Sequence, residues 1–331
     1  MQSIRWGIAG PGRIAHVVAP DFAHVPGAEL VAVGSRSPQR AEAFAREHGV
    51  ARAHGSYGAL IADPDVDVVY VATPHPQHHA IALAAIRAGK AVLVEKAFTA
   101  TRAGAEEIAA EARGRGVFAM EAMWTRFLPA VVRARDLIAD GAIGPVAAVQ
   151  ADLGIVREFD GSDRMFAAAL GGGALLDLGV YVVSLAQMVL GTPQRVHAVG
   201  THEVNGVEAS AALLLAWDDG RAATLVTSLH SPMPAAAWIF GADGFIELPP
   251  RFHHPSRVVL HRAGRAPEEI VLPPTGTGYT HELVEVTERI RAGATESAVM
   301  PLEDTVAVMG ILEDAAGQLG VSWSEDTTVP I

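Results

Sequence analysis

A glycine-rich turn near the start of the chain limits the possible folds more than any other feature. Its sequence is Gly10-Pro11-Gly12-Arg13-Ile14-Ala15, and it follows the apolar segment 4–9 and precedes a helical pattern. The two glycines allow a tight turn and close approach of the backbone to a pyrophosphate, which then lies at the helix N-terminus. In this strand–turn–helix context the motif predicts a dinucleotide site. A tight turn without a ligand is the alternative.

Residues 1–120 alternate short apolar segments with helical ones, which is typical of a parallel sheet with helices on both faces. The expected strands are 4–9, 30–34, 67–72, 91–95 and 117–120. The expected helices are 14–22, 38–47, 77–88 and 101–113. This pattern predicts the α/β class, with a doubly wound parallel (Rossmann) sheet in an N-terminal domain over residues 1–121.

After Glu121 the pattern changes to β-rich segments separated by turn signals such as Asp218-Asp219-Gly220. The expected strands are 146–153, 195–201, 209–217, 222–229, 236–240, 245–248, 258–261 and 269–272. The expected helices are 128–139, 174–190, 281–291 and 302–319. A chain of 331 residues is long for one core. We therefore expect a C-terminal α+β domain over residues 122–331, with a large, mostly antiparallel sheet.

Composition excludes several classes of protein. A net charge of −12 argues against nucleic-acid binding, and the absence of cysteine excludes disulfides and thiolate metal sites. No apolar run reaches the roughly 20 residues of a membrane span, and no basic segment precedes the first strand. We therefore expect a cytoplasmic protein without a signal peptide. His75, His78 and His79 have spacings that suit a metal, but no set of carboxylates lies nearby in the sequence, so no metal is predicted.

The end of the second expected strand indicates which dinucleotide would bind. An NAD site usually places a carboxylate there to accept from the ribose hydroxyls, whereas this chain has Ser35-Arg36-Ser37. An arginine can pair with a 2′-phosphate through charge-assisted hydrogen bonds. The sequence therefore favours NADP over NAD. The alternative is that Arg36 is a solvated surface residue.

Lysine is scarce, and its positions are informative. Of 25 lysines and arginines only Lys90 and Lys96 are lysine, and both flank one expected strand. An ammonium group is a compact point charge with a tunable pKa, unlike a guanidinium group. Lys96 follows Glu95 at the end of that strand and is a candidate acid–base or electrostatic group, although a surface lysine is the alternative. We expect Lys90 to be structural.

Further candidate residues for a cofactor and substrate site come after an expected strand and on a later helix. Thr73, Pro74 and His78 come after the preceding strand, at the same edge of the sheet. Much later, a glycine turn leads into a helix that carries Asp177 and Tyr181, four residues apart and on one face. Lysine, aspartate and tyrosine together would form a proton-relay set beside a nicotinamide. Three further residues are candidate substrate contacts: Trp124 and Arg126, which otherwise pack the domain junction, and more weakly Phe159.

Taken together, these motifs resemble the glucose–fructose oxidoreductase/inositol dehydrogenase (Gfo/Idh/MocA) family. The resemblance rests on the glycine turn, the run 89–96 ending in Glu95-Lys96, and the Asp177-x-x-x-Tyr181 pair. Within the family the chain most resembles the dimeric dihydrodiol dehydrogenase and NADP-dependent xylose dehydrogenase branch, through residues 35–37, 121–129 and 171–181. The family's lysine is normally followed by proline, and Ala97 stands there in this chain.

The resemblance implies an NADP-dependent oxidoreductase. Such an enzyme transfers a hydride between the nicotinamide and a hydroxyl or carbonyl carbon of a sugar, cyclic polyol or trans-dihydrodiol. Two alternatives remain, a non-catalytic NADP-sensing regulator on the same fold and an NAD-dependent glycosidase of the same superfamily. Because the second sheet has an apolar face that needs cover, we also expect a homodimer through that sheet.

The resemblance also implies a role for each candidate. The pyrophosphate would be held by Gly10, Gly12, Arg13 and Ile14, and the 2′-phosphate by Ser35 and Arg36. The cofactor groove would be lined by Thr73, Pro74 and His78, with Glu95 and Lys96 near the nicotinamide ribose. Asp177 and Tyr181 would come from the second domain. Tyr181 would exchange the proton with substrate, and Lys96 would lower the pKa of that tyrosine and polarise the substrate oxygen.

Overall fold

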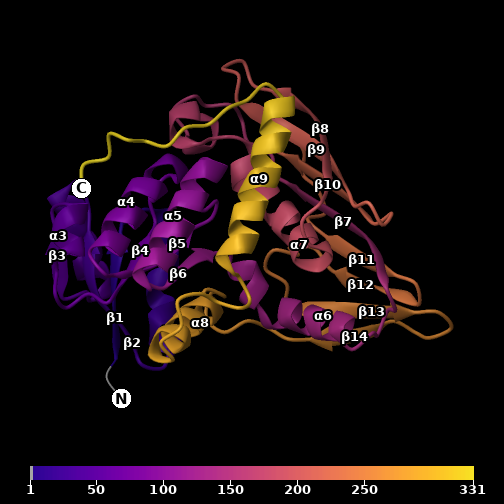
Figure 1. Cartoon of the computed structure of the whole chain (residues 1–331), viewed down its shortest axis with the longest axis horizontal. Helices are drawn as coiled ribbons and strands as arrows, with labels where there is room; N and C mark the ends of the chain where they lie inside the picture. The colour runs from indigo at the N-terminus through magenta and orange to yellow at the C-terminus, as the bar shows by residue number, and fades with distance from the viewer. Residues whose placement is uncertain (1–2) are drawn as a thin grey trace. The chain divides into compact units, whose positions relative to one another are not determined.

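The computed structural model describes residues 3–331, in two compact units (Figure 1). The first unit runs through Trp124 and also contains Thr275–Val306 and Ser324–Ile331. The second unit contains Thr125–Pro274 and Ala307–Trp323. The chain therefore returns to the first unit twice after leaving it. Residues 1 and 2, which belong to the expected first domain, lie outside the described residues.

The first unit contains a six-stranded parallel sheet in the order β3-β2-β1-β4-β5-β6. Its strands are β1 (Ile4–Ala9), β2 (Ala28–Gly34), β3 (Arg52–His54), β4 (Val68–Val71), β5 (Ala91–Glu95) and β6 (Ala119–Ala122). Every residue of β4 and β5 is buried, as the continuous apolar runs predict. Successive strands are added to one side of β1 as far as β3 and to the other side from β4 onward. Ligands bind at the carboxyl ends of the strands beside such a switch point.

Six α-helices of the described residues lie wholly in the first unit. They are α1 (Arg13–Val18), α2 (Pro38–His48), α3 (Tyr57–Ile61), α4 (His75–Arg87), α5 (Arg102–Arg115) and α8 (Thr280–Arg291). Helix α4 packs against β4, β5 and α5 (Figure 1). Helix α2 packs against β2 and β3. The side chains of Ser37, Ser56 and Thr101 cap α2, α3 and α5.

Two local features of the first unit differ from the sequence pattern. The helix expected over 14–22 is divided into two. Helix α1 ends at Val18, and a 3₁₀ helix, Ala19–His24, follows it. Pro20 lies at the start of that 3₁₀ helix and has no N–H group for continuing an α-helix. Strand β3 and helix α3 are additional elements, and their lengths of three and five residues are too short for a clear periodic signal.

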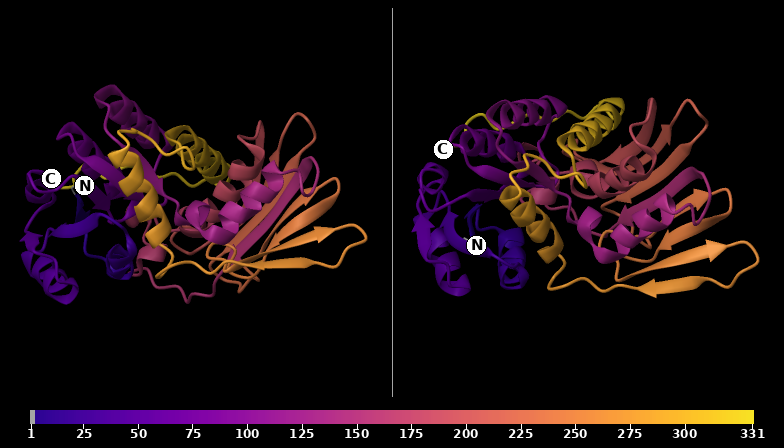
Figure 2. Two further views of the ribbon diagram at one scale, coloured as in Figure 1. Left: turned by 90° about the horizontal axis from the view of Figure 1, so that it is seen from below. Right: turned by 60° about the horizontal axis from the view of Figure 1, so that its bottom comes forward.

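The second unit contains an eight-stranded sheet, whose strands are drawn in magenta to orange in Figure 2. The strand order is β14-β13-β12-β11-β7-β10-β9-β8. Its strands are β7 (Val146–Gly154), β8 (Arg195–His202), β9 (Glu208–Ala216), β10 (Ala222–Ser228), β11 (Ala237–Gly241), β12 (Gly244–Leu248), β13 (Arg257–Arg262) and β14 (Glu268–Val271). Only β7 and β10 pair in parallel among these described strands. The expectation of a large, mostly antiparallel sheet is therefore confirmed.

Helices cover one face of this sheet. Helix α6 (Pro129–Ala139) packs against β13, and α7 (Val180–Leu190) packs against β7 and β10. Helix α9 (Leu302–Gln318) ends in this unit. In the described part of the chain, one helical stretch, Ala168–Leu190, is long and apolar enough to span a membrane by length and composition. The fold buries 83% of its most apolar window, which is typical of a core helix.

Candidate active site

The glycine turn of the first unit, called the glycine cradle below, leaves a space that a side chain at Gly10 would occupy. Gly10 has a φ of 97°, and a Cβ atom there would lie 2.8 Å from Thr73 Cγ2 and 3.0 Å from the Ala72 carbonyl oxygen. Gly12 is the N-cap residue of α1, and no described side chain caps this helix, in contrast with α2, α3 and α5. The N–H groups of Arg13 and Ile14 therefore remain suited to bind phosphate oxygens. These residues fit a dinucleotide.

Two guanidinium groups lie beside the end of β2. Arg36 is exposed and hydrogen-bonds to Tyr57, whose pKa is raised by burial and partly lowered again by that arginine. Arg40 donates from Nη2 to the Pro11 carbonyl oxygen of the glycine turn at 3.3 Å. Ser35 is buried, and its Oγ accepts from the Ser37 N–H at 3.1 Å. Arg40 was not among the sequence candidates, although its position four residues after Arg36 was a usable signal.

His78 connects the loops after β4 and β5. The ring is fully buried, with Nε2 2.7 Å from the Thr73 carbonyl oxygen and Nδ1 3.0 Å from the Ala97 carbonyl oxygen. Both partners are carbonyl oxygens, so a ring nitrogen that carries a hydrogen donates to the carbonyl oxygen beside it. His78 thereby holds the residue that follows Lys96 against the loop that contains Thr73 and Pro74.

Glu95 is fixed by two donors, and Lys96 extends from the same strand end. The Tyr70 hydroxyl donates to Glu95 Oε1, and the Lys96 N–H donates to Oε2 at 3.2 Å. Burial and the Glu95 charge raise the pKa of Tyr70 well above its ordinary value, so Tyr70 stays protonated as a donor. The Lys96 side chain is half-buried. This lysine therefore lies at the carboxyl edge of the sheet that carries the glycine cradle.

A further carboxyl group lies near Glu95. Glu282 of α8 is fully buried, and neither of its carboxyl oxygens has a hydrogen-bond partner among the described residues. Burial, followed by the charges of Glu95, Asp21 and Glu121, raises the pKa of Glu282 well above its ordinary value. Burial therefore favours the neutral form of Glu282. The sequence pattern did not single out this residue, because its neighbours in the fold come from distant segments.

In the second unit, Asp177 and Tyr181 lie on consecutive turns. Asp177 belongs to a π-helical segment, Leu175–Gly179, that continues into α7. Its Oδ1 accepts from Arg164 Nη2 at 2.8 Å. Tyr181 is buried, and its ring centroid lies 5.4 Å from that of His253. A π-helical turn often marks a functional position.

The candidate substrate contacts have different surroundings. The Arg126 guanidinium is buried and donates to Ser184 Oγ at 3.1 Å and to Gln187 Oε1 at 2.6 Å, so it connects residue 126 to α7. Trp124 stacks on Tyr279, with ring centroids 4.2 Å apart. Phe159 is partly exposed and makes an edge contact with Phe166, with centroids 5.3 Å apart.

Glu208 is a buried group that the sequence pattern did not indicate. It begins β9, is fully buried, and its Oε1 accepts from the Leu175 N–H at 3.0 Å. A Cβ atom on Gly173 would lie 2.1 Å from that oxygen, so the glycine turn leaves the space that Glu208 occupies. Burial raises the pKa of Glu208 to about 7, the Leu175 N–H lowers it in part, and the Asp177 charge raises it further.

We expect Glu208→Gln to change how stability depends on pH. Because folding raises the pKa of Glu208 from about 4.5 to about 7, its favourable contribution is complete below pH 4.5 and is lost as the pH rises to 7. The loss is up to about 3 kcal/mol. Denaturant unfolding should show the variant gaining stability relative to wild type across this window. For the exposed control Glu42→Gln, the difference in unfolding free energy from wild type should not change with pH. The same pH-independent difference in Glu208→Gln would contradict the assignment.

The chain is similar to known oxidoreductases over nearly its whole length. Residues 4–123 match an oxidoreductase family with an NAD-binding Rossmann fold, and residues 131–247 match the GFO/IDH/MocA C-terminal domain. A trans-1,2-dihydrobenzene-1,2-diol dehydrogenase from Bos taurus is 34% identical over 338 residues, covering 98% of this chain and 99% of that protein.

Two solved structures share the fold. A 3-ketoreductase from Actinomadura kijaniata, in complex with NADP and TDP-benzene, is 29% identical with a TM-score of 0.84, covering 98% of this chain and 99% of that one. An aldose–aldose oxidoreductase from Caulobacter crescentus, complexed with glycerol, is 26% identical with a TM-score of 0.88, covering 96% of this chain and 98% of that one.

Proposed function

Because this chain belongs to the GFO/IDH/MocA family of oxidoreductases, we propose that it is an NADP-dependent dehydrogenase of a trans-dihydrodiol, sugar or cyclic polyol. The observation that carries the proposal is the arrangement of the first unit. The glycine cradle at Gly10 and the half-buried Lys96 lie at the carboxyl edge of one parallel sheet. A dinucleotide site and a cation at one edge suit hydride transfer next to a substrate oxygen.

NADP, when bound, supplies the carbon that accepts or donates the hydride. The residues of the chain supply binding and proton transfer. We assign the pyrophosphate to the turn beginning at Gly10 and the 2′-phosphate to Ser35, Arg36 and Arg40. Tyr181 takes the proton from the substrate hydroxyl as a tyrosinate during oxidation and gives it back from its hydroxyl during reduction. Lys96 favours the tyrosinate and polarises the substrate oxygen.

Supporting residues hold these groups. Arg164 forms an ion pair with Asp177 and so holds that carboxylate in place, and the carboxylate is proposed to accept from a substrate hydroxyl. Arg126 acts through α7, since it binds Ser184 and Gln187 on the helix that carries Tyr181. Trp124 and Phe159 are proposed to provide apolar and aromatic contact to the substrate ring. We propose the dinucleotide-binding role for residues 1–121 and the substrate-binding and dimerisation role for residues 122–331.

The chain retains residues that the two alternative functions do not require. A non-catalytic NADP sensor needs no proton-transfer set, whereas Lys96, Asp177 and Tyr181 are all present. An NAD-dependent glycosidase would retain its nucleotide through a catalytic cycle and need no external one. Mass spectrometry of nucleotides released from the purified protein, followed by an NADP⁺ reduction screen over dihydrodiols, aldoses and inositols, distinguishes the three. Turnover of NADP⁺ by one substrate class is expected, and its absence across the panel would refute the proposal.

Cofactor choice is tested by Arg36→Asp. We expect NADPH to bind wild type several-fold more tightly than NADH, because Arg36 and Arg40 lie beside the end of β2. The substitution removes a phosphate partner and adds repulsion, so NADPH affinity should fall about tenfold or more, with little change for NADH. Fluorescence titration measures both affinities. Arg46→Asp, the same charge change near the other end of α2, is the control. Equal NADPH and NADH affinities in wild type would contradict the assignment.

We also propose a homodimer through the open face of the eight-stranded sheet. Leu214 is 44% exposed and Val226 37% exposed on this face, and they line a cavity of about 460 Å³. Trp238, Phe240 and Phe245 are half-buried on the same sheet. Such an apolar face favours a self-complementary contact between two copies. Light scattering should give a dimer, and Leu214→Glu should give a monomer. A monomeric wild type at all concentrations would refute this assembly.

A cytoplasmic location is part of the same proposal, because the reaction depends on the cellular pool of NADP. The substrate is a small molecule, and neither a nucleic acid nor a membrane is required for the chemistry.

A further inference from the structure

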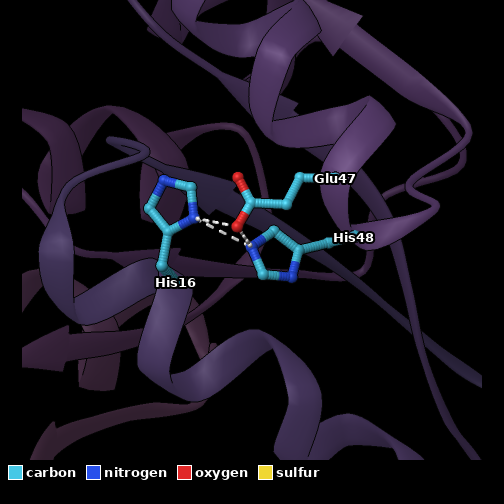
Figure 3. Close-up of side chains that lie close together, drawn as sticks. All are labelled: His16, Glu47 and His48. Carbon is cyan, nitrogen blue, oxygen red and sulfur yellow. Dashed lines mark hydrogen bonds and ion pairs between the residues drawn. The ribbon is translucent and has the colours of Figure 1, made fainter.

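A cluster outside the candidate active site brings three metal-binding side chains together (Figure 3). His16 lies on α1, while Glu47 and His48 end α2, and their ligand atoms converge. His16 Nδ1 is 2.9 Å from His48 Nε2 and 3.4 Å from Glu47 Oε1, and His48 Nε2 is 3.7 Å from the same oxygen. Within residues 3–331 this is the one group of three such ligands found this close together.

These distances match the requirements of a zinc ion. Zinc binds imidazole nitrogen and carboxylate oxygen at about 2.0–2.1 Å in a tetrahedron, so its ligand atoms lie about 3.3 Å from one another. The three observed separations, 2.9, 3.4 and 3.7 Å, lie on either side of that value. Shifts of a few tenths of an ångström in the side chains would make the three atoms equidistant from one ion. Two histidines and one carboxylate are a common donor set for zinc with one open position.

The surroundings also favour a cation. Glu47 and His48 occupy the last turn of the eleven-residue helix α2, where the helix dipole is negative. Phe44 packs against both imidazoles, with ring centroids 4.8 Å from His16 and 4.4 Å from His48, and limits how far the rings can turn. Glu47 is mostly exposed, with 61% of its side chain accessible. Water can therefore reach a fourth coordination position. The positive charge nearest to the cluster in the sequence is Arg46, which is exposed on the same turn of α2.

We propose that His16, Glu47 and His48 bind one divalent transition-metal ion of the zinc type. The ion takes the place of the hydrogen that the two imidazoles share between Nδ1 and Nε2, and the ring that carried this hydrogen carries it on its other nitrogen instead. Both histidines are then neutral and the carboxylate is ionised. Bound metal links α1, which follows the glycine cradle, to the end of α2, and so stabilises the first unit.

Metal titrations of the full-length protein test this site. The protein is stripped with a chelator and titrated with Zn²⁺ against a chromophoric competitor, and with Co²⁺ while its visible absorption is recorded. One ion per chain is expected, with an intense tetrahedral Co²⁺ spectrum. His16→Asn and His48→Gln should each weaken Zn²⁺ binding at least tenfold, and Glu47→Gln should weaken it less. His24→Gln, an exposed histidine of the same unit outside the cluster, should bind as wild type does.

A second measurement uses the wild type alone and does not depend on variants that fold. X-ray absorption of the zinc-loaded protein should show two imidazole ligands and oxygen donors. Thermal unfolding should shift to higher temperature with Zn²⁺, because a ligand of the folded state stabilises it. Binding that is unchanged in His48→Gln, or fewer than two imidazoles in the wild-type spectrum, would overturn the proposal. The pair would then be a histidine–histidine hydrogen bond only. Neither result depends on dehydrogenase activity.

Discussion

Replacing Tyr181 with phenylalanine is expected to lower kcat by about 100-fold or more, with little change in NADPH affinity. Tyr181 belongs to α7, and its ring packs against that of His253. Phenylalanine keeps the shape of this buried side chain and removes only the hydroxyl. That hydroxyl carries the proton in the proposed reaction. A tyrosine at its ordinary pKa of about 10 is a poor base at neutral pH, and a nearby cation brings the pKa down. Steady-state turnover and NADPH titration separate chemistry from binding.

A matched control exists among the four tyrosines of the chain. Tyr279→Phe keeps the ring that stacks on Trp124 and removes a hydroxyl elsewhere, so it should retain turnover within a few-fold of wild type. Near wild-type turnover in Tyr181→Phe, with a substrate found in the NADP⁺ reduction screen, would rule out this tyrosine as the proton-transfer group.

Lys96→Met should also lower kcat by about 100-fold or more, and it should change the pH profile as well. Without the ammonium group, the tyrosinate is less favoured, so the alkaline rise in the oxidation rate moves to higher pH. Lys96→Arg should restore little activity, because a planar guanidinium cannot replace a compact charge at this position. The rate is measured as a function of pH for each variant.

The only other lysine provides the control. Lys90 Nζ donates to the carbonyl oxygens of Val66 at 2.6 Å and Asp63 at 3.0 Å, which confirms the structural role expected from the sequence. Lys90→Met should therefore lower stability and leave the pH of the alkaline rise unchanged. If both lysine variants move that pH equally, the shift reflects general loss of charge and Lys96 has no specific role.

Much of the fold was predictable because each element carries its own signal. The strand over 91–95 has the expected bounds, because it has a continuous apolar centre and Gly89 precedes it. The antiparallel strands show alternating burial, and β9 buries Ala209, Ala211, Leu213 and Leu215 in this way. Local capping residues such as Ser37 fix the helix starts.

The parts that could not be predicted depend on contacts between distant segments. Residues 275–306 return to the first unit, where the Thr277 and Thr280 N–H groups donate to Asp21 at 2.8 and 2.9 Å. Nothing in the local sequence marks Asp21 for that contact. Glu208 and Glu282 read as ordinary strand and helix residues, and their burial follows only from packing. The sequence identified residues with unusual local patterns, whereas it could not identify ordinary residues placed in unusual environments.

Transfer of a labelled hydride tests the proposed dehydrogenase activity most directly. A trans-dihydrodiol deuterated at its hydroxyl-bearing carbons is incubated with the protein and NADP⁺, and the reduced nucleotide is analysed by mass spectrometry. Direct transfer from the substrate carbon predicts NADPH that is heavier by one deuterium, with the same label pattern from a deuterated sugar if sugars are the substrates. Reduced nucleotide without deuterium, or none with any labelled substrate, would contradict the proposed activity.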